Sequence, residues 1–307
     1  MNLAKYQSLA EQLSTVRDFF RFTLTSMQQK QLFYGHGTDT AWDDALALVF
    51  DTLQLPHDAQ KLFLDARLVD AEKSILLERI YQRIEEYKPV PYLTHIAWYA
   101  NFAFYVDERV IIPRSPIAEL IERRFSPWLE ISAESSILDL CTGSACIAIT
   151  CAHYFPETSI DAIDISPEAL AVAQINVDKH QVGEQVNLIQ SDLFSAVSDK
   201  KYDLIISNPP YVDAQDMYEL PHEFRHEPEL ALASGHDGLE ATKTILQQAS
   251  RYLHDDGILI VEVGNSQAAL TSAYPDVPFM WLEFERGGHG VFLLTKSQLV
   301  HFLELFD

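Results

Sequence analysis

The tetrapeptide Asn208-Pro209-Pro210-Tyr211 directly follows residues 203–207, an apolar run with the composition of a buried strand. Two successive prolines fix φ and remove two amide donors from this turn. The Asn208 side-chain oxygen and the Pro209 carbonyl can therefore both accept hydrogen bonds, and two acceptors match the two N–H protons of a planar NH2 group. Tyr211 adds an aromatic face or a hydroxyl that can hold such a group. These residue types predict a site for an amine or amide, with a rigid proline turn and an incidental tyrosine as the alternative.

A glycine-containing turn, Asp139-Leu140-Cys141-Thr142-Gly143-Ser144-Ala145-Cys146, follows an earlier apolar run. Gly143 lets the backbone approach a ligand closely. The dinucleotide-binding fingerprint has three glycines, however, and this turn has only one. Taken alone, the turn fits either a ligand-binding loop or a plain tight turn.

Carboxylates also stand at the ends of two further apolar runs. Asp164 lies twenty-five residues after Asp139, near the place of the ribose-binding carboxylate in dinucleotide-binding folds. A helix-capping aspartate is the alternative there, and we expect the neighbouring Asp161 to be solvated. Asp192 and Leu193 end the next run and offer a carboxylate to an exocyclic amine, beside an apolar side chain that can pack on a purine. Together these ends predict a nucleoside site next to the Asn208 turn.

The elements that carry these ends alternate between strands and helices. After Glu134, apolar runs at 137–140, 159–163, 186–189, 204–207 and 258–263 predict strands. Ser166-Pro167-Glu168 is a good helix start, with a capping hydroxyl and a proline in the first turn. Such alternation predicts an α/β fold whose open parallel sheet is covered on both faces and binds ligands at the carboxyl ends of its strands. Residues 280–284 and 290–294 predict a closing antiparallel hairpin.

The N-terminal part of the chain has a different pattern. Apolar residues recur at helical spacing through residues 70–87, and Thr40 can cap a helix that runs to about Leu53. Residues 96–113 are instead rich in aromatic and β-branched side chains, which predicts a hairpin. We therefore expect an N-terminal helical domain at 1–93, a β-hairpin linker at 94–116 and the α/β domain at 117–307.

The composition predicts a globular protein with an unusual charge. Of 307 residues, 48% are apolar, and 22 Lys and Arg stand against 45 Asp and Glu, a net charge of −23. Residues 1–134 carry −5 and the remainder −18. Such charge repels phosphate backbones and favours basic partners, so we expect no direct nucleic-acid binding.

The same sequence predicts a compartment and excludes several kinds of site. It begins without an apolar signal core and contains no eighteen-residue apolar run. The cysteines, Cys141, Cys146 and Cys151, fit neither a disulfide framework nor paired metal-binding motifs. We expect a cytoplasmic protein with no membrane association and no metal.

The ordered set from Asp139 to Tyr211 resembles the class I S-adenosylmethionine-dependent methyltransferases of the glutamine N5 group. Within that group, residues 113–116 (Pro-Arg-Ser-Pro), the turn 139–146 and residues 226–232 (His-Glu-Pro-Glu-Leu-Ala-Leu) are similar to enzymes that methylate a glutamine of the third large-subunit ribosomal protein. They are less similar to the release-factor relatives. The resemblance, which runs from about Trp98 to Leu294, implies a Rossmann-like domain with a mostly parallel seven-stranded sheet and an antiparallel last strand. It also implies S-adenosyl-L-methionine as cofactor and a basic ribosomal protein as substrate.

The resemblance further implies a role for each site residue. The cofactor's methionine part would be wrapped by Asp139, Cys141, Thr142, Gly143, Ser144 and Ala145, its ribose hydroxyls held by Asp164, and its adenine contacted by Asp192 and Leu193. The substrate amide would be held by Asn208, Pro209, Pro210 and Tyr211, with Asn208 also next to the cofactor. Where the wider family has its first and third glycines, this chain has Cys141 and Ala145, whose β-carbons make a positive φ costly.

Charge also bears on the choice among substrates. Eight acids and one base lie between Val212 and Glu240, just after the substrate turn. They would steer a basic protein, although a surface kept acidic for solubility has the same composition. A release-factor glutamine and a nucleic-acid adenine N6 amine are alternative substrates, and −18 on the catalytic part opposes the second. A noncatalytic ribosome-assembly factor is a further alternative, against which the intact Asn208 turn argues.

Three signals are left open or set aside. His222-Glu223-Phe224-Arg225-His226 matches the zinc-peptidase pattern, but flanking prolines leave little room for the long helix of such a site. We interpret this segment as a substrate-side loop. Arg114 can reach the active site or pair with local acids, and Glu262, at the end of the fifth predicted strand, is equally open.

Overall fold

The computed structural model describes residues 3–197 and 200–306. Its chain divides into two compact units. Unit 1 comprises the chain up to Ala97, residues 106–108 and Pro221–His226, whereas unit 2 comprises Trp98–Tyr105, Arg109–Leu220 and the chain from Glu227 onward. The short segment Pro221–His226 thus belongs to unit 1, although the chain on both sides of it belongs to unit 2.

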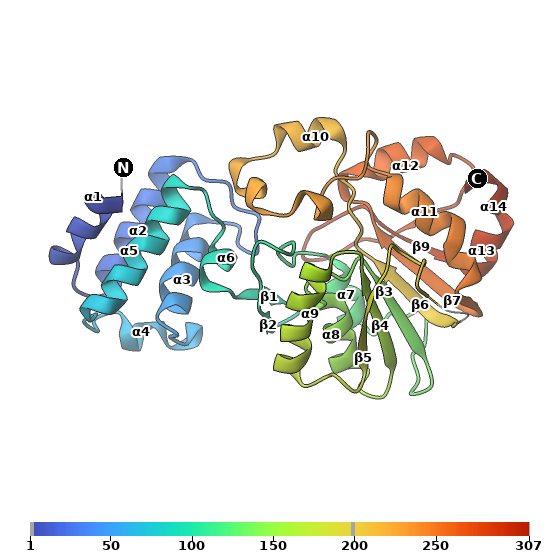
Figure 1. Ribbon diagram of the computed structural model, residues 1–307, viewed down its shortest axis with the longest axis horizontal. Coiled ribbons are helices and arrows are strands. Elements are labelled where there is room, and N and C mark those ends of the chain that lie inside the picture. Colours follow the sequence, from blue (N-terminus) through green and yellow to red (C-terminus); the bar gives the residue numbers. More distant parts are fainter. Residues whose placement is uncertain (1–2, 198–199, 307) are drawn as a thin grey trace. The chain divides into compact units, whose positions relative to one another are not determined.

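Unit 1 is helical (Figure 1), as the sequence predicts. Its α-helices are α1 (Leu3–Gln7), α2 (Val16–Lys30), α3 (Ala41–Thr52), α4 (Gln60–Phe63), α5 (Asp70–Glu85) and α6 (Val90–Thr94), with 3₁₀ helices at Ser8–Glu11, His57–Ala59 and His222–His226. The predicted cap at Thr40 is confirmed, because its hydroxyl accepts a hydrogen bond from the Asp43 amide at 3.2 Å. Phe19, Leu48 and Leu77 are fully buried where α2, α3 and α5 pack together.

Unit 2 contains a sheet of seven strands in the order β5-β4-β3-β6-β7-β9-β8. The strands are β3 (Ser136–Leu140), β4 (Ser159–Asp164), β5 (Val186–Gln190), β6 (Tyr202–Ser207), β7 (Leu253–Glu262), β8 (Met280–Trp281) and β9 (Val291–Thr295). Neighbours from β5 to β7 are parallel, and β9 runs antiparallel to both β7 and β8. The predicted α/β fold, with its antiparallel last strand, is confirmed.

Helices cover both faces of this sheet (Figure 1). Alternate residues of one strand point to opposite faces, so Ile137 joins the core under α7 (Ile117–Glu122), α8 (Cys146–Tyr154) and α9 (Pro167–His180), while Leu138 joins the other core. That second core includes residues from α11 (Glu240–Gln248), α12 (Gln267–Ala273), α13 (Lys296–His301) and α14 (Leu303–Phe306). Burial on both faces explains why the strands read as continuous apolar runs.

The remaining elements of unit 2 lie at its connections. The predicted hairpin at 96–113 is wrong in extent, because in the described residues its strands are only β1 (Ala97–Tyr99) and β2 (Phe102–Phe104). The side chain of Asn176 on α9 accepts a hydrogen bond from the Tyr105 amide at 2.7 Å and donates one to the Tyr105 carbonyl at 3.0 Å. These two backbone groups are therefore not available to extend the pairing of β1 and β2. Beyond β6 the chain forms α10 (Ala214–Glu219), and 3₁₀ helices lie at Glu229–Ala231, Ala249–Arg251 and Gly264–Ser266. Across residues 3–197 and 200–306, no helix combines the length and apolar character needed to cross a bilayer.

Candidate active site

The carboxyl ends of β3, β4, β5 and β6 meet at one cavity in unit 2. It has a volume of about 400 Å³, within the rough range of 300–1,000 Å³ for small-molecule sites. Each strand end contributes lining residues: Cys141 and Gly143 after β3, Asp164 from β4, Asp192 and Leu193 after β5, and Asn208 and Pro210 after β6. The structure therefore brings together residues from all four strand ends that the sequence singled out. Asp139, Thr142, Ser144, Ala145, Pro209 and Tyr211 do not line the cavity.

The other walls give the cavity an apolar and acidic character. Ile111 and Ile163 are among its apolar side chains, and Leu230 comes from the segment that follows Pro221–His226. Its charged lining consists of the carboxylates of Asp164, Asp192 and Glu240 and the guanidinium of Arg109. A net negative lining favours a ligand that carries positive charge next to apolar rings.

The turn after β3 keeps a left-handed backbone at residues that carry β-carbons. Cys141, Gly143 and Ala145 have φ values of 60°, 55° and 61°. Non-glycine residues in this region are strained by roughly 1–2 kcal/mol each, so the structure retains the backbone of a three-glycine turn at a cost in stability. A β-carbon built on Gly143 would meet only the Ile111 Cγ2, at 3.9 Å, which leaves the backbone open to a ligand.

Two buried polar residues hold this strained turn. The Oδ2 of Asp139 accepts hydrogen bonds from the Thr142 hydroxyl at 2.5 Å and the Ala148 amide at 3.2 Å. Asn176, fully buried on α9, donates to the Ser144 carbonyl at 3.0 Å. These bonds offset the backbone strain and fix the direction of the turn.

Asp139 is also a strongly perturbed acid. Its side chain is fully buried and its Oδ1 has no hydrogen-bond partner among the described residues. Burial raises the pKa of Asp139 to about 7, from an ordinary value of 3.8, against the opposing hydrogen bonds from Thr142 and Ala148. The folded protein therefore binds this proton more tightly than the unfolded chain does between about pH 4 and 7.

This shift predicts that Asp139→Asn changes the pH dependence of stability. Because the folded pKa is raised, the stabilisation from a protonated Asp139 is fully present below about pH 4 and is lost as the pH rises through 7. The variant has no such proton and lacks this loss. The unfolding free energy of the variant minus that of the wild type should therefore increase by something on the order of 2–4 kcal/mol from pH 4 to pH 8. Urea unfolding across this range measures the difference, with Asp178→Asn on the exposed face of α9 as control. Equal pH dependence in wild type and Asp139→Asn would contradict the assignment.

Asn208 is presented to the cavity with its hydrogen-bonding capacity unused. It follows directly on β6, whose last residue, Ser207, is tied to the β3 end by a hydroxyl hydrogen bond to the Leu140 carbonyl at 2.9 Å. Asn208 is one of the residues that line the cavity, and within residues 3–197 and 200–306 its carboxamide makes no hydrogen bond. An amide held at a rigid turn with both groups available is suited to bind another polar group.

Tyr211 is turned toward buried groups rather than into the cavity. Its hydroxyl donates to the Oε1 of Glu262 at 3.2 Å, and its backbone carbonyl accepts from the Ser266 hydroxyl at 2.7 Å. The ring lies so close to Gly264 that a β-carbon there would be 2.6 Å from the Tyr211 Cε2. Burial, and then the charge of Glu262, raise the pKa of Tyr211, so the hydroxyl is a donor. Through its contacts with Glu262 and Ser266, Tyr211 thus helps to orient the Asn208 turn.

The two residues that the sequence left open have defined partners. Arg114 forms a bidentate ion pair with buried Glu227, at 2.6 and 2.8 Å, and Glu227 also accepts from the Ile112 amide at 3.0 Å. Glu262 accepts from the Ser115 hydroxyl at 2.5 Å and from Tyr211. Burial raises the pKa of Glu262. Arg114 therefore pairs with a local acid, and Glu262 links the 113–116 loop to the Asn208 turn.

One expectation about an aspartate was wrong. Asp161 is 5% exposed and accepts hydrogen bonds from Lys200 and the Tyr202 hydroxyl, both at 2.7 Å, and from Asn187 at 3.2 Å. Its strand lies between two others. Its partners, Asn187 on β5, Tyr202 on β6 and Lys200 shortly before β6, are 26 to 41 residues away in sequence, too far for a local pattern to place them. Asn176 and Ser115 were missed for the same reason, although a polar residue on the apolar face of a predicted helix is a signal for Asn176.

The acidic segment 212–240, which follows the Asn208 turn, exposes fewer charges than the sequence predicts. Glu223 and Glu227 are buried and paired with arginines, so they do not belong to a solvent-facing rim. Glu219, Glu229 and Glu240 are exposed, and Asp213 and Asp216 are partly exposed. Asp237 pairs with Lys243 at 2.6 Å. The surface remains acidic, but fewer charges act on a partner at a distance.

Comparisons with known proteins identify the family of this chain. The methyltransferase small domain family matches residues 124–238. The ribosomal protein uL3 glutamine methyltransferase of Francisella tularensis subsp. tularensis is 48% identical over 98% of this chain and 96% of that protein. The enzyme of the same description from Neisseria gonorrhoeae is 49% identical over 96% of this chain and 99% of that protein.

A solved structure supports the fold alone. The catalytic domain of hMettl16, in complex with a MAT2A 3′UTR hairpin, aligns with a TM-score of 0.50 and 15% identity, covering 76% of this chain and 85% of that one. The predicted resemblance and fold class are both confirmed. On these similarities, the chain is an enzyme that belongs to the ribosomal protein uL3 glutamine methyltransferase family.

Proposed function

We propose that the enzyme transfers a methyl group from S-adenosyl-L-methionine to the side-chain amide nitrogen, N5, of a glutamine in the large-subunit ribosomal protein uL3. The observation that carries the proposal is that Asn208 lines the cavity together with the turn after β3, while its carboxamide makes no hydrogen bond within the described residues. The two relatives described above are named for this substrate. Such an enzyme would act in the cytoplasm, where its substrate is made.

Residues around the cavity fit the methyl donor. The turn from Asp139 to Ala145 would hold the methionine part, with the open backbone at Gly143 allowing close approach. Asp164 would accept the ribose hydroxyl protons, and Asp192 with Leu193 would bind the adenine. When bound, the donor supplies an electrophilic methyl group on a positively charged sulfur, and the negative lining favours that charge.

The substrate side must activate a poor nucleophile. The lone pair of a glutamine amide nitrogen is delocalised into its carbonyl. Asn208 Oδ1 would accept a hydrogen bond from one N–H, and the other would be accepted by the carbonyl of Pro209, which lies in the chain between the lining residues Asn208 and Pro210. These two bonds would raise the electron density on nitrogen and fix its direction. Positive charge then develops on nitrogen in the transition state, and the same acceptors stabilise it. A proton leaves to water after transfer, so this mechanism uses no dedicated base.

The acidic surface after the Asn208 turn supports a basic substrate and disfavours nucleic acid. Ribosomal proteins that contact RNA carry excess positive charge, which complements residues such as Glu219 and Glu229. A phosphate backbone would be repelled by the same carboxylates. We further propose that residues 1–93 help to select the substrate, with 94–116 as linker and 117–307 as the catalytic part.

Electrostatic steering predicts a salt effect on the rate. Raising the ionic strength from about 0.05 to 0.5 M should lower kcat/KM for the intact ribosomal protein roughly three- to tenfold, since the Debye length falls to a few ångströms. The double variant Glu219→Gln/Glu229→Gln should show a shallower dependence. Glu157→Gln/Glu184→Gln, in exposed loops before β4 and β5, is the matched control. Identical salt slopes for all three proteins would rule out steering by this surface.

One assay tests the proposed function. The purified enzyme is given methyl-labelled S-adenosyl-L-methionine together with unmodified uL3, release factors, or nucleic acids. Label on a uL3 glutamine, located by peptide mass and fragmentation, is the expected result. Transfer to a release factor or to adenine, with none to uL3, would replace the proposal by that alternative.

A further inference from the structure

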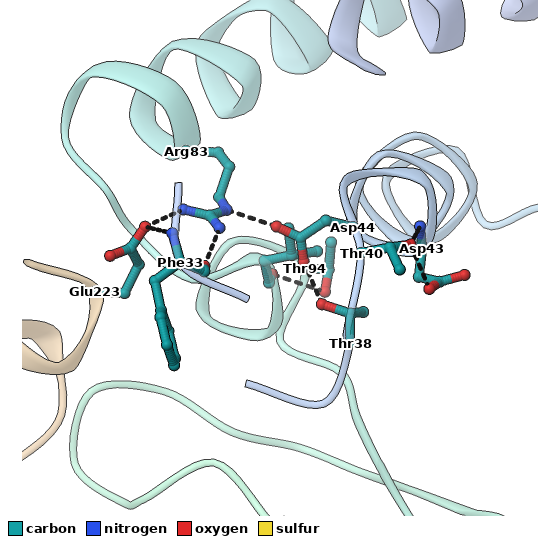
Figure 2. A network of polar contacts seen from close by, with 9 residues as sticks. Phe33, Thr38, Thr40, Asp43, Asp44, Arg83, Thr94 and Glu223 are labelled. Atoms are coloured by element: carbon teal, nitrogen blue, oxygen red, sulfur yellow. Dashed lines mark hydrogen bonds and ion pairs between the residues drawn. The ribbon is translucent and has the colours of Figure 1, made fainter. Parts of the chain in front are cut away.

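A buried arginine in unit 1 holds the segment Pro221–His226 through two carboxylates. Arg83 is 2% exposed, and its Nη1 donates to the Oε1 of Glu223 at 3.1 Å, while its Nε donates to the Oδ2 of Asp44 at 2.7 Å. Its Nη2 donates to the Phe33 carbonyl at 2.9 Å, and the Phe33 amide donates to the same Glu223 oxygen at 2.9 Å. Figure 2 shows the guanidinium between the two acids, with Glu223 on a different stretch of chain from Asp44.

Three further side chains of this segment, Phe224, His222 and His226, also contact residues of unit 1. Phe224 packs on Phe33 and His36, with ring centroids 5.4 and 4.5 Å away. His222 packs on Tyr87, with centroids 4.9 Å apart, and His226 Nε2 lies 2.8 Å from the Glu86 carbonyl oxygen. Through these contacts the segment is held at several side chains and not at Glu223 alone. The zinc-peptidase pattern in the sequence is thus used as an anchor, with its glutamate committed to Arg83.

The anchored segment interrupts the chain between two parts of the active site. The Asn208 turn ends at Tyr211, ten residues before Pro221. Immediately after His226, Glu227 pairs with Arg114, and Pro228 and Leu230 then line the cavity. The chain from the substrate turn to the cavity wall must therefore pass through the anchor in unit 1.

We propose that Arg83 is a positioning residue for methyl transfer: by holding Glu223, it fixes the chain between the Asn208 turn and the cavity wall. The helical unit then has a second role besides substrate selection. Removing the guanidinium leaves the buried carboxylates of Asp44 and Glu223 without their counter-charge, and release of the segment into water would relieve this cost. The segment's release would loosen residues 212–220 and 227–234, which it connects. The expected fall in kcat rests on the proposed function, whereas the expected change in hydrogen exchange does not.

Two variants and a matched control separate anchoring from general stability. Arg83→Met removes the charge and keeps the length of the side chain. Glu223→Gln removes one carboxylate charge but keeps an acceptor for the Phe33 amide and the guanidinium, so it should be the milder change. Arg17→Met removes a different ion pair of unit 1, with Asp65, whose side chains are 56% and 82% exposed. This control should behave as wild type.

Amide hydrogen exchange followed by mass spectrometry reports local opening directly. In Arg83→Met, exchange within 212–220 and 227–234 should be faster by at least about tenfold, while amides of β3 to β6 keep their protection. The kcat for uL3 should fall by at least about tenfold in the same samples, measured at a temperature where unfolding curves show full folding, with Glu223→Gln intermediate.

Two results would overturn the proposal. One is a folded Arg83→Met protein with wild-type exchange in both flanking segments. The other is faster exchange confined to the helices of unit 1, with unchanged kcat, which would give Arg83 a role in stability alone. If Arg83→Met does not fold, Glu223→Gln carries the same comparison. Absence of methyl transfer by the wild type would refute the proposed function and leave the exchange result to decide the anchor.

Discussion

Replacing Asn208 by alanine is expected to lower kcat for uL3 methylation by at least about 100-fold while changing the Kd for S-adenosylhomocysteine by no more than about threefold. Asn208 lines the cavity directly after β6, and its carboxamide has no hydrogen-bond partner in the described residues. Losing the oxygen removes one of two acceptors for the substrate N–H groups, which act most strongly when charge develops on nitrogen. Single-turnover kinetics and calorimetric titration measure the two quantities.

The matched variant for this experiment is Asn208→Asp. Aspartate keeps an oxygen acceptor of the same length, so it should retain more activity than alanine if accepted hydrogen bonds are what the reaction needs. Full turnover by Asn208→Ala would show that the carboxamide does not hold the substrate. Loss of S-adenosylhomocysteine binding in parallel with kcat would show a role in the cofactor site instead.

Replacing Gly264 by alanine is expected to have the second large effect, since it displaces the Tyr211 ring. The new β-carbon would lie 2.6 Å from Cε2 and 2.8 Å from Cζ of Tyr211, and Gly264 has a φ of +44°. Backbone strain and overpacking together should cost about 3–4 kcal/mol of unfolding free energy. A ring that moves away from the new β-carbon would lose its hydrogen bond to Glu262, which would release the Asn208 turn. We expect kcat to fall by at least about 100-fold in the protein that remains folded.

The chain offers a control for backbone strain. Gly287 also has a positive φ, +89°, but a β-carbon there would meet nothing within 4 Å. Gly287→Ala should cost only about 1 kcal/mol and leave kcat unchanged. In a double-mutant cycle, Tyr211→Leu should recover part of the stability lost in Gly264→Ala, because it removes the atoms that clash. Equal stability losses in Gly264→Ala and Gly287→Ala would contradict the close packing of Tyr211.

The strands, caps and strand-end residues were predictable because their signals are local. A buried parallel strand reads as a short apolar run, and Ser166 and Thr40 cap helices through bonds made within three residues. Topology then follows from the alternation of strands and helices, and it brings four strand ends to one edge. Thus the sequence could predict that Asp164, Asp192 and Asn208 lie near one another, as they do around the cavity.

The contacts that orient the site were not predictable, because their partners are far apart in sequence. Tyr211 and Glu262 are separated by 51 residues, and Arg83 and Glu223 by 140. Nothing near Tyr211 indicates that its hydroxyl faces a buried carboxylate instead of the cavity. The positive φ of Cys141 and of Ala145 was also not predictable from the sequence, because local rules assign a positive φ to glycine. Hydrogen bonds from Thr142 and Ala148 to the nearby Asp139, and a long-range bond from Asn176 to the Ser144 carbonyl, hold the turn in this conformation.

The most direct test of the central claim is a crystal structure of the enzyme with S-adenosylhomocysteine and a glutamine-containing uL3 peptide. The expected electron density has the sulfur in the cavity facing Asn208, with the glutamine amide nitrogen between them and within hydrogen-bond distance of the Asn208 Oδ1 and the Pro209 carbonyl. Density that places the sulfur away from Asn208, or the glutamine amide on other acceptors, would contradict the proposed chemistry.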